Sequence, residues 1–264
     1  MKTASVAIFA VAVAIALAVG GSIAQAQTTI DTSRHDLATG TGDNNEICVY
    51  CHTPHASETT IEAPLWNKPA SGATYQTYDS TISTTLDGAV LGVGSVSIAC
   101  LSCHDGTQAM DTVINQPGRN GFNAAGARIG SLGGTGEIDD PAGNPNTPLN
   151  PVANIDVDLT NDHPIGILYG GFDTGTGPSD PDFVTPATAS INNVAQWWVD
   201  TTAPGAQLGV REKTDMILYR RDNGGTFQPF VECASCHDPH NPANGTFLRV
   251  SNDNSDVCLA CHVK

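Results

Sequence analysis

The hydrophobic positions of this 264-residue chain form one long run near the start and only short, isolated runs afterwards. Apolar residues at helical spacing, which an amphipathic helix needs, are scarce. Val194–Val199 and Met216–Arg220 are isolated apolar runs that predict short strands or helical turns. Between such runs Gly, Asn, Pro and Asp give turn signals, for example in Gly133–Gly136 and Asn144–Pro148. The pattern predicts a mostly irregular backbone with short helices and few short strands.

The long apolar run, Val6–Val19, predicts an export signal. It follows Lys2 and precedes Ala24-Gln25-Ala26, whose small residues suit cleavage. A membrane anchor is the weaker interpretation, because the run is shorter than the ~20 residues that span a bilayer. We expect residues 1–26 to be removed, and residues 27–264 to form a single unit without a membrane span.

The composition excludes several classes of partner and predicts an unusual interior. Asp and Glu number 27 against 11 Lys and Arg, which gives a net charge of −16. Such a chain is repelled by nucleic acid and by anionic membrane surfaces, and its charge favours either solubility or a basic partner protein. With 27 Gly and 16 Pro among many small polar residues, the sequence predicts a poor apolar core. We therefore expect another group to fill the interior.

The cysteines indicate which group that is. All eight occur in four Cys-x-x-Cys-His frames. A disulfide framework or a zinc site would use the cysteines but would leave the recurring histidine unexplained. One helical turn brings residues i, i+3 and i+4 to one face, where two thiols attach a haem and the histidine becomes its proximal iron ligand. The frames are Cys48-Val-Tyr-Cys51-His52, Cys100-Leu-Ser-Cys103-His104, Cys233-Ala-Ser-Cys236-His237 and Cys258-Leu-Ala-Cys261-His262.

The histidine count matches four irons that each have two imidazole ligands. The chain has eight histidines, of which four belong to the frames. The remaining candidates for distal ligands are His35, His55, His163 and His240. Methionine is the competing distal ligand, and after the signal it occurs only at Met110 and Met216.

Two distal candidates stand three residues after a proximal histidine, in His52-Thr-Pro-His55 and His237-Asp-Pro-His240. Three extended residues span at most ~10 Å, and proline stiffens the path. That length cannot wrap around a porphyrin, so His55 and His240 should each reach a different haem from the one beside them. The haems are then expected to pack closely.

The Cys-x-x-Cys-His-x-Pro-His phrase, the early His35-Asp36-Leu37, Asp162–Ile165 and the closing Phe247–Asn252 resemble bacterial and archaeal multihaem cytochromes with doubled haem motifs. A four-haem chain of this size with an export signal resembles the extracellular cytochromes that polymerise into haem-chain filaments, or nanowires. The resemblance covers about residues 31–56, 98–106, 161–166 and 230–264. It implies a multihaem cytochrome c fold around a closely packed haem chain, with one distal histidine crossing between subunits. His35 is the first candidate for that role and His163 the second.

The motif positions divide the mature chain. Residues 31–104 should hold a first haem pair and residues 233–264 a second one. Residues 105–232 form a haem-free, Gly-, Asn- and Pro-rich connector that carries His163. Trp197 and Trp198 in this connector either pack on a porphyrin or subunit contact, or are ordinary strand residues.

Two weaker motifs remain. Asp156, Asp158, Asn161 and Asp162 offer oxygen ligands to calcium, but without a glycine-centred loop and a terminal Glu. Asn244-Gly245-Thr246 is a glycosylation sequon.

Three functional hypotheses stay open. The first is an electron carrier that polymerises outside the cell or on its surface, and passes electrons to other redox proteins or extracellular acceptors. The second is a monomeric shuttle in the periplasm. The third, a multihaem reductase, needs an iron with an open coordination position, whereas every histidine here is assigned to ligation. We therefore expect an electron carrier and no enzyme.

Overall fold

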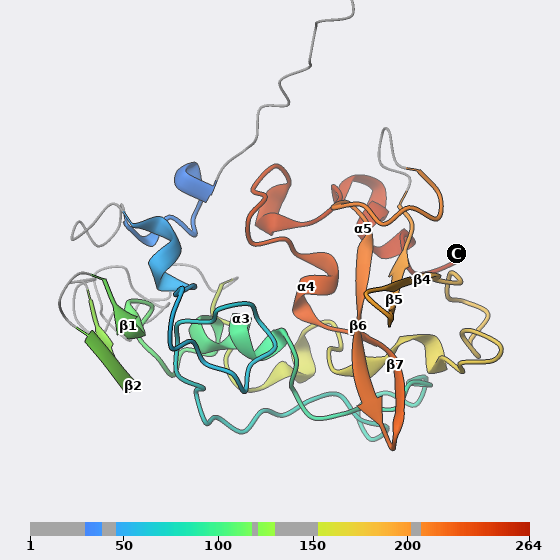
Figure 1. Ribbon diagram of the computed structural model, residues 1–264. Helices are drawn as coiled ribbons and strands as arrows, with labels where there is room; N and C mark the ends of the chain where they lie inside the picture. The colour runs from blue at the N-terminus through green and yellow to red at the C-terminus, as the bar shows by residue number, and fades with distance from the viewer. Residues whose placement is uncertain (1–29, 39–45, 118–120, 130–152, 202–206) are drawn as a thin grey trace, which may run out of the picture.

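The computed structural model describes residues 30–38, 46–117, 121–129, 153–201 and 207–264. The predicted export signal, Gly133–Gly136 and Asn144–Pro148 lie outside the described residues. In Figure 1 a β-hairpin lies at one end and a five-stranded sheet at the other, with two of the motif helices between them.

Short helices form at all four motifs, as predicted. The first motif begins in the 3-10 helix η2 (Ile47–Tyr50) and the second lies in α3 (Ser97–His104). The third and fourth lie in α4 (Cys233–Cys236) and α5 (Asp256–Leu259). No helix in the described part of the chain is both long enough and apolar enough to cross a membrane. The other 3-10 turns are η1 (Ile30–Thr32), η3 (Leu159–Asn161), η4 (Tyr169–Gly171), η5 (Gly245–Phe247) and η6 (Asp253–Ser255).

The connector contains more regular structure than the sequence predicted. Its antiparallel sheet has the strand order β3-β7-β6-β5-β4, and a separate hairpin joins β1 and β2. Both isolated apolar runs are strands. The strands are β1 (Thr112–Gln116), β2 (Gly121–Arg128), β3 (Ile167–Leu168), β4 (Ala187–Ile191), β5 (Val194–Val199), β6 (Met216–Asn223) and β7 (Thr226–Val231).

Two tight turns explain why the sheet forms in a glycine- and asparagine-rich chain. Asn192 and Asn193 join β4 to β5 with φ values of 53° and 63°, and Gly224 and Gly225 join β6 to β7 with φ values of 64° and 91°. Two-residue hairpins with a type I′ turn need positive φ at both central positions, which Asn and Gly adopt at low cost. The turn signals therefore mark hairpins at these two places.

The expectation of a poor apolar core is wrong for the sheet. Trp197, Val199, Met216, Leu218 and Phe230 are buried in one cluster with residues of β3, η4 and β7. Strands β5, β6 and β7 contribute two buried side chains each to this cluster, and β3 contributes one. In β5 and β6 the contributing residues alternate along the strand, because alternate residues of a strand point to opposite faces. Such short contributions leave no long periodic signal in the sequence.

The two tryptophans are strand residues of β5. Trp197 belongs to the apolar cluster and contacts Phe172, with ring centroids 6.2 Å apart. Trp198 is 1% exposed, and its Nε1 donates to Asp200 Oδ1 at 2.8 Å. Their contacts favour the second of the two interpretations made from the sequence.

Candidate functional site

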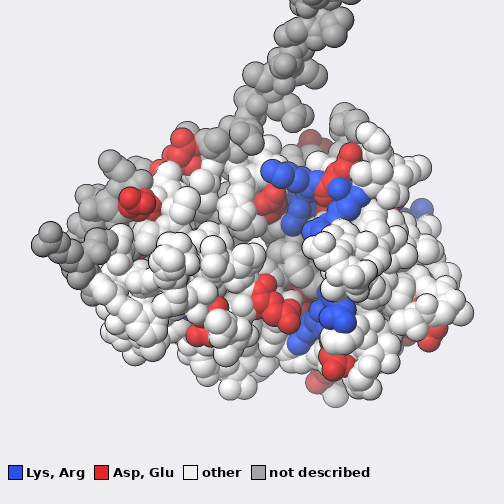
Figure 2. All heavy atoms as spheres, in the orientation of Figure 1, with Lys and Arg blue, Asp and Glu red and all other residues white. Residues whose placement is uncertain are grey.

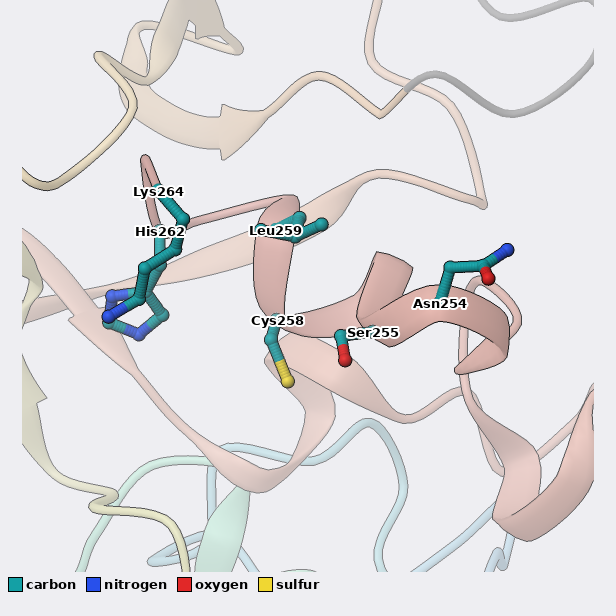
Figure 3. Close-up of a pocket in the computed structure, with 6 residues that line it drawn as sticks. All are labelled: Asn254, Ser255, Cys258, Leu259, His262 and Lys264. Atoms are coloured by element: carbon teal, nitrogen blue, oxygen red, sulfur yellow. The ribbon is translucent and has the colours of Figure 1, made fainter.

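The motif segments fold so that both cysteines and the histidine share one face. The amide of His52 donates to the carbonyl of Cys48 at 2.8 Å, and that of His262 donates to Cys258 at 2.9 Å. Each bond closes one helical turn between residues i and i+4, which aligns positions i, i+3 and i+4. All eight thiols are free. Figure 3 shows Cys258 and His262 among the residues that line a pocket at the fourth motif.

Backbone carbonyls orient three of the four proximal imidazoles. The Nδ1 atoms of His52, His104 and His237 lie 2.7 Å from the carbonyl oxygens of Pro64, Ala153 and Thr246. A carbonyl only accepts, so Nδ1 carries the proton and Nε2 keeps its lone pair free. Such bonds fix the tautomer and the ring orientation of histidines that ligate metals.

Three proximal histidines face a second imidazole from a distant segment. The ring centroids are 6.1 Å apart for His35 and His104, 6.0 Å for His52 and His240, and 6.4 Å for His163 and His262. A nitrogen–metal bond is about 2 Å, so two rings on opposite sides of one iron place their centroids roughly 6 Å apart. The residues thus fit iron ligation by paired histidines at three motifs.

His240 faces His52 and not the His237 that stands three residues before it. This agrees with the argument from chain length that a His-x-Pro-His phrase serves two different sites.

His35 is held inside its own chain. Its ring stacks on Phe247 at 4.2 Å, and its Nδ1 lies 3.2 Å from the carbonyl oxygen of Pro239. Burial is the main cause that lowers the pKa of His35 and also that of His104, which favours the neutral imidazole that metal ligation requires. The structure therefore places His35, the first candidate for a ligand between subunits, against His104 of its own chain. His163, the second candidate, likewise faces His262 of its own chain.

His55 and His237 are left over from the pairing. Within the described part of the chain, neither ring faces a second imidazole. Both residues are exposed. The backbone carbonyl of His55 accepts from Thr53 Oγ1 at 3.0 Å and from Asn115 Nδ2 at 2.8 Å, so a hydrogen-bonded loop presents the free ring to solvent.

Thiols of successive motifs lie close together. Burial and then the Cys103 thiol raise the pKa of Cys51 to about 12. Burial and then the Cys236 thiol raise the pKa of Cys261 to about 12. The Cys100 and Cys233 thiols, from the second and third motifs, interact closely enough that the pKa of Cys100 is raised and that of Cys233 is lowered. Thiols of each motif therefore lie near those of the next motif along the chain.

The structure also shows a buried lysine side chain beside the first motif, which no pattern in the sequence predicted. Lys68 is fully buried, and its Nζ donates to the carbonyls of Met110 and Thr112 at 2.7 and 2.9 Å. It lies near enough to lower the pKa of the Cys51 thiol, against the larger effect of burial. Among the described residues no carboxylate lies within salt-bridge distance of it.

On the face drawn in Figure 2, Lys and Arg side chains gather in two groups among acidic ones.

The calcium hypothesis gains no support. Asp156 Oδ1 accepts from the amide of Val157, and Asp158 Oδ1 accepts from the amide and hydroxyl of Thr160. The described ranges contain no group of three or more metal-ligating side chains.

The asparagine of the glycosylation sequon makes a hydrogen bond within its own loop, because the Asn244 side-chain amide donates to the Leu248 carbonyl at 2.8 Å.

A family model described as the doubled CXXCH motif matches residues 228–264. The match contains the third and fourth motifs together with His240. No curated protein matches the chain. The CXXCH motif indicates covalently bound haem c and supports electron transfer by haem.

Proposed function

We propose that this protein is an electron carrier with four covalently attached haems, one at each motif. The observation that carries the proposal is the set of three imidazole pairs, each joining a proximal histidine to one from a distant segment at 6.0 to 6.4 Å. Histidines that share no ligand are not expected to meet at this spacing three times.

A haem, when attached, supplies an iron that changes reversibly between its ferric and ferrous forms. The imidazole pairs His35–His104, His52–His240 and His163–His262 would hold this iron, and the same ligands would serve both forms. Two nitrogen ligands without methionine favour low potentials. The carbonyls of Pro64 and Ala153 hold the rings of His52 and His104 in place as the charge changes.

The fourth site leads us to propose polymerisation. His237 has no imidazole opposite it among the described residues, and His55 is exposed on an anchored loop with no ring facing it. If His55 of one copy ligates the iron at His237 of the next, every histidine is used and the haem chain continues across the contact. We propose that the exported protein forms such filaments outside the cell, with the same chain as its main partner.

Two other functions would follow if His237 stayed without a partner. A monomeric carrier in the periplasm needs no ligand from a second copy. A reductase needs an open iron, and the exposed face of His237 is the place in this chain where one would occur. The filament is favoured over these two functions because it also explains the unpaired His55.

The experiment compares wild-type protein with His55→Ala and with Thr59→Ala, an exposed control in the same loop. We expect the wild type and the control to form filaments in electron micrographs with four low-spin haems per chain. The His55→Ala protein should remain monomeric, with one high-spin haem and three low-spin haems. Monomeric wild type with four low-spin haems would overturn the filament, and nitrite binding to the ferric wild type would favour the reductase.

A further inference from the structure

A buried polar network joins the second and third motifs. Ser97 stands three residues before Cys100 in α3, and Glu232 immediately precedes Cys233 at the start of α4. The Ser97 hydroxyl donates to Glu232 Oε2 at 2.5 Å and accepts from the Cys233 amide at 2.9 Å. One side chain therefore bridges the two motif helices, which lie side by side in Figure 1.

Arg221 of β6 completes this network from the sheet. Its Nη1 lies 3.1 Å from Glu232 Oε1, and its Nη2 donates to the carbonyl of Gly92 at 2.9 Å. The guanidinium passes close to a glycine, because a Cβ at Gly94 would lie 2.6 Å from Nη2. The sheet thus supports the junction of the two motifs.

The network is almost completely removed from water. Ser97 is 0% exposed, Glu232 1% and Ser235 2%. The Ser235 hydroxyl accepts from the Glu232 amide at 2.9 Å, and the two residues form a reciprocal cap at the start of α4. Burial raises the pKa of Glu232 to about 7, with Ser97 and Arg221 opposing the shift.

Burying a carboxylate has a desolvation cost that an ion pair often fails to recover, so such a pair is weak evidence for stability. The buried Arg221–Glu232 pair is better explained by the position of the groups that it joins. The network joins α3 and α4, which are in contact and carry Cys100 and Cys233, and the thiols of these two residues would attach the haems of neighbouring sites.

We propose that Ser97, Glu232 and Arg221 are positioning residues that set the spacing and orientation of the second and third haem sites. The proposal rests on the proposed electron-transfer function, because it concerns the contact through which those two sites exchange an electron. The three residues contact the attachment segments and none of them ligates iron.

The test uses the haem-loaded protein and circular dichroism in the Soret band, where neighbouring haems give a two-signed couplet that depends on their separation and angle. The variants are Ser97→Ala, Glu232→Gln and Gly94→Ala, which displaces the Arg221 guanidinium while leaving both motif helices intact. Glu62→Gln is the control, because Glu62 is exposed but close enough to Glu232 to affect its pKa.

We expect the Ser97→Ala and Glu232→Gln proteins to keep four haems per chain by mass while the couplet weakens, and the control to match the wild type. Unchanged couplets in fully loaded variants would overturn the proposal. If either variant loads fewer than four haems, the couplet of the Gly94→Ala protein is compared with that of the wild type instead. A weaker couplet would support the proposal, and an unchanged couplet would overturn it. Wild type with fewer than four haems would instead contradict the proposed function itself.

Discussion

Replacing Glu232 with glutamine should change how the stability of the haem-loaded protein depends on pH. The pKa of this carboxyl is raised from 4.5 to about 7, mainly by burial. Below 4.5 the folded and unfolded chains both hold the proton, so the group makes no difference. As pH rises, the unfolded chain releases the proton first, and the free energy of unfolding falls until pH passes about 7. At 1.36 kcal/mol for each pH unit, this loss is about 3 kcal/mol.

Glutamine is neutral throughout this range, so the variant should lack that loss. The measurement is urea unfolding of both proteins at about pH 4 and about pH 8, followed by far-ultraviolet circular dichroism. We expect the variant to gain about 3 kcal/mol relative to wild type between the two conditions, because all other titrating groups cancel in the difference. Arg221 opposes the shift and Glu62 adds to it, so Glu62→Gln should change the dependence only slightly. Parallel pH profiles for wild type and Glu232→Gln would refute the reasoning.

Three further outcomes follow from the structure. Asn115→Ala removes the amide that anchors the loop of His55 at 2.8 Å, so electron micrographs should show fewer filaments while mass spectrometry still finds four haems; undiminished assembly would contradict the role of the loop. Lys68→Met removes a buried positive charge beside the first motif, so one of four midpoint potentials should become more negative in a potentiometric titration, and four unchanged potentials would count against it. Phe230→Ala empties a fully buried position and should cost about 3–5 kcal/mol in denaturant unfolding, whereas Leu208→Ala, at an 85% exposed position, should change stability by less than about 0.5 kcal/mol.

The haem attachments could be predicted from the sequence because their chemistry is local. Two thiols and a histidine within five residues define the motif, and the i to i+4 bonds of His52 and His262 close the expected turn. The argument that His240 does not share a site with His237 is equally local, since three residues have a maximum length whatever the fold. Both predictions depend only on residues that lie close together in the sequence, and not on which distant segments meet in the fold.

The pairing of the histidines could not be predicted, because it depends on which distant segments meet. His35 was expected to reach another copy because it stands near the start of the mature chain. The structure instead places it against Phe247 and His104. The sheet and its apolar cluster were missed for a similar reason, since their strands pair only after the Asn192-Asn193 and Gly224-Gly225 turns bring them together.

The three imidazole pairs also suggest why so irregular a chain folds at all. The sheet and its apolar cluster lie within the second half of the chain, whereas His35 and His52 belong to the first half, where long loops predominate. Both of these histidines face partners far along the sequence, and a link that closes a long loop restricts the unfolded chain most. Iron ligation would then stabilise the first half as cross-links do in other domains with small cores. By the same logic, a ligand supplied by His55 of a second copy would stabilise both copies, so polymerisation and the rigidity of the haem chain would increase together.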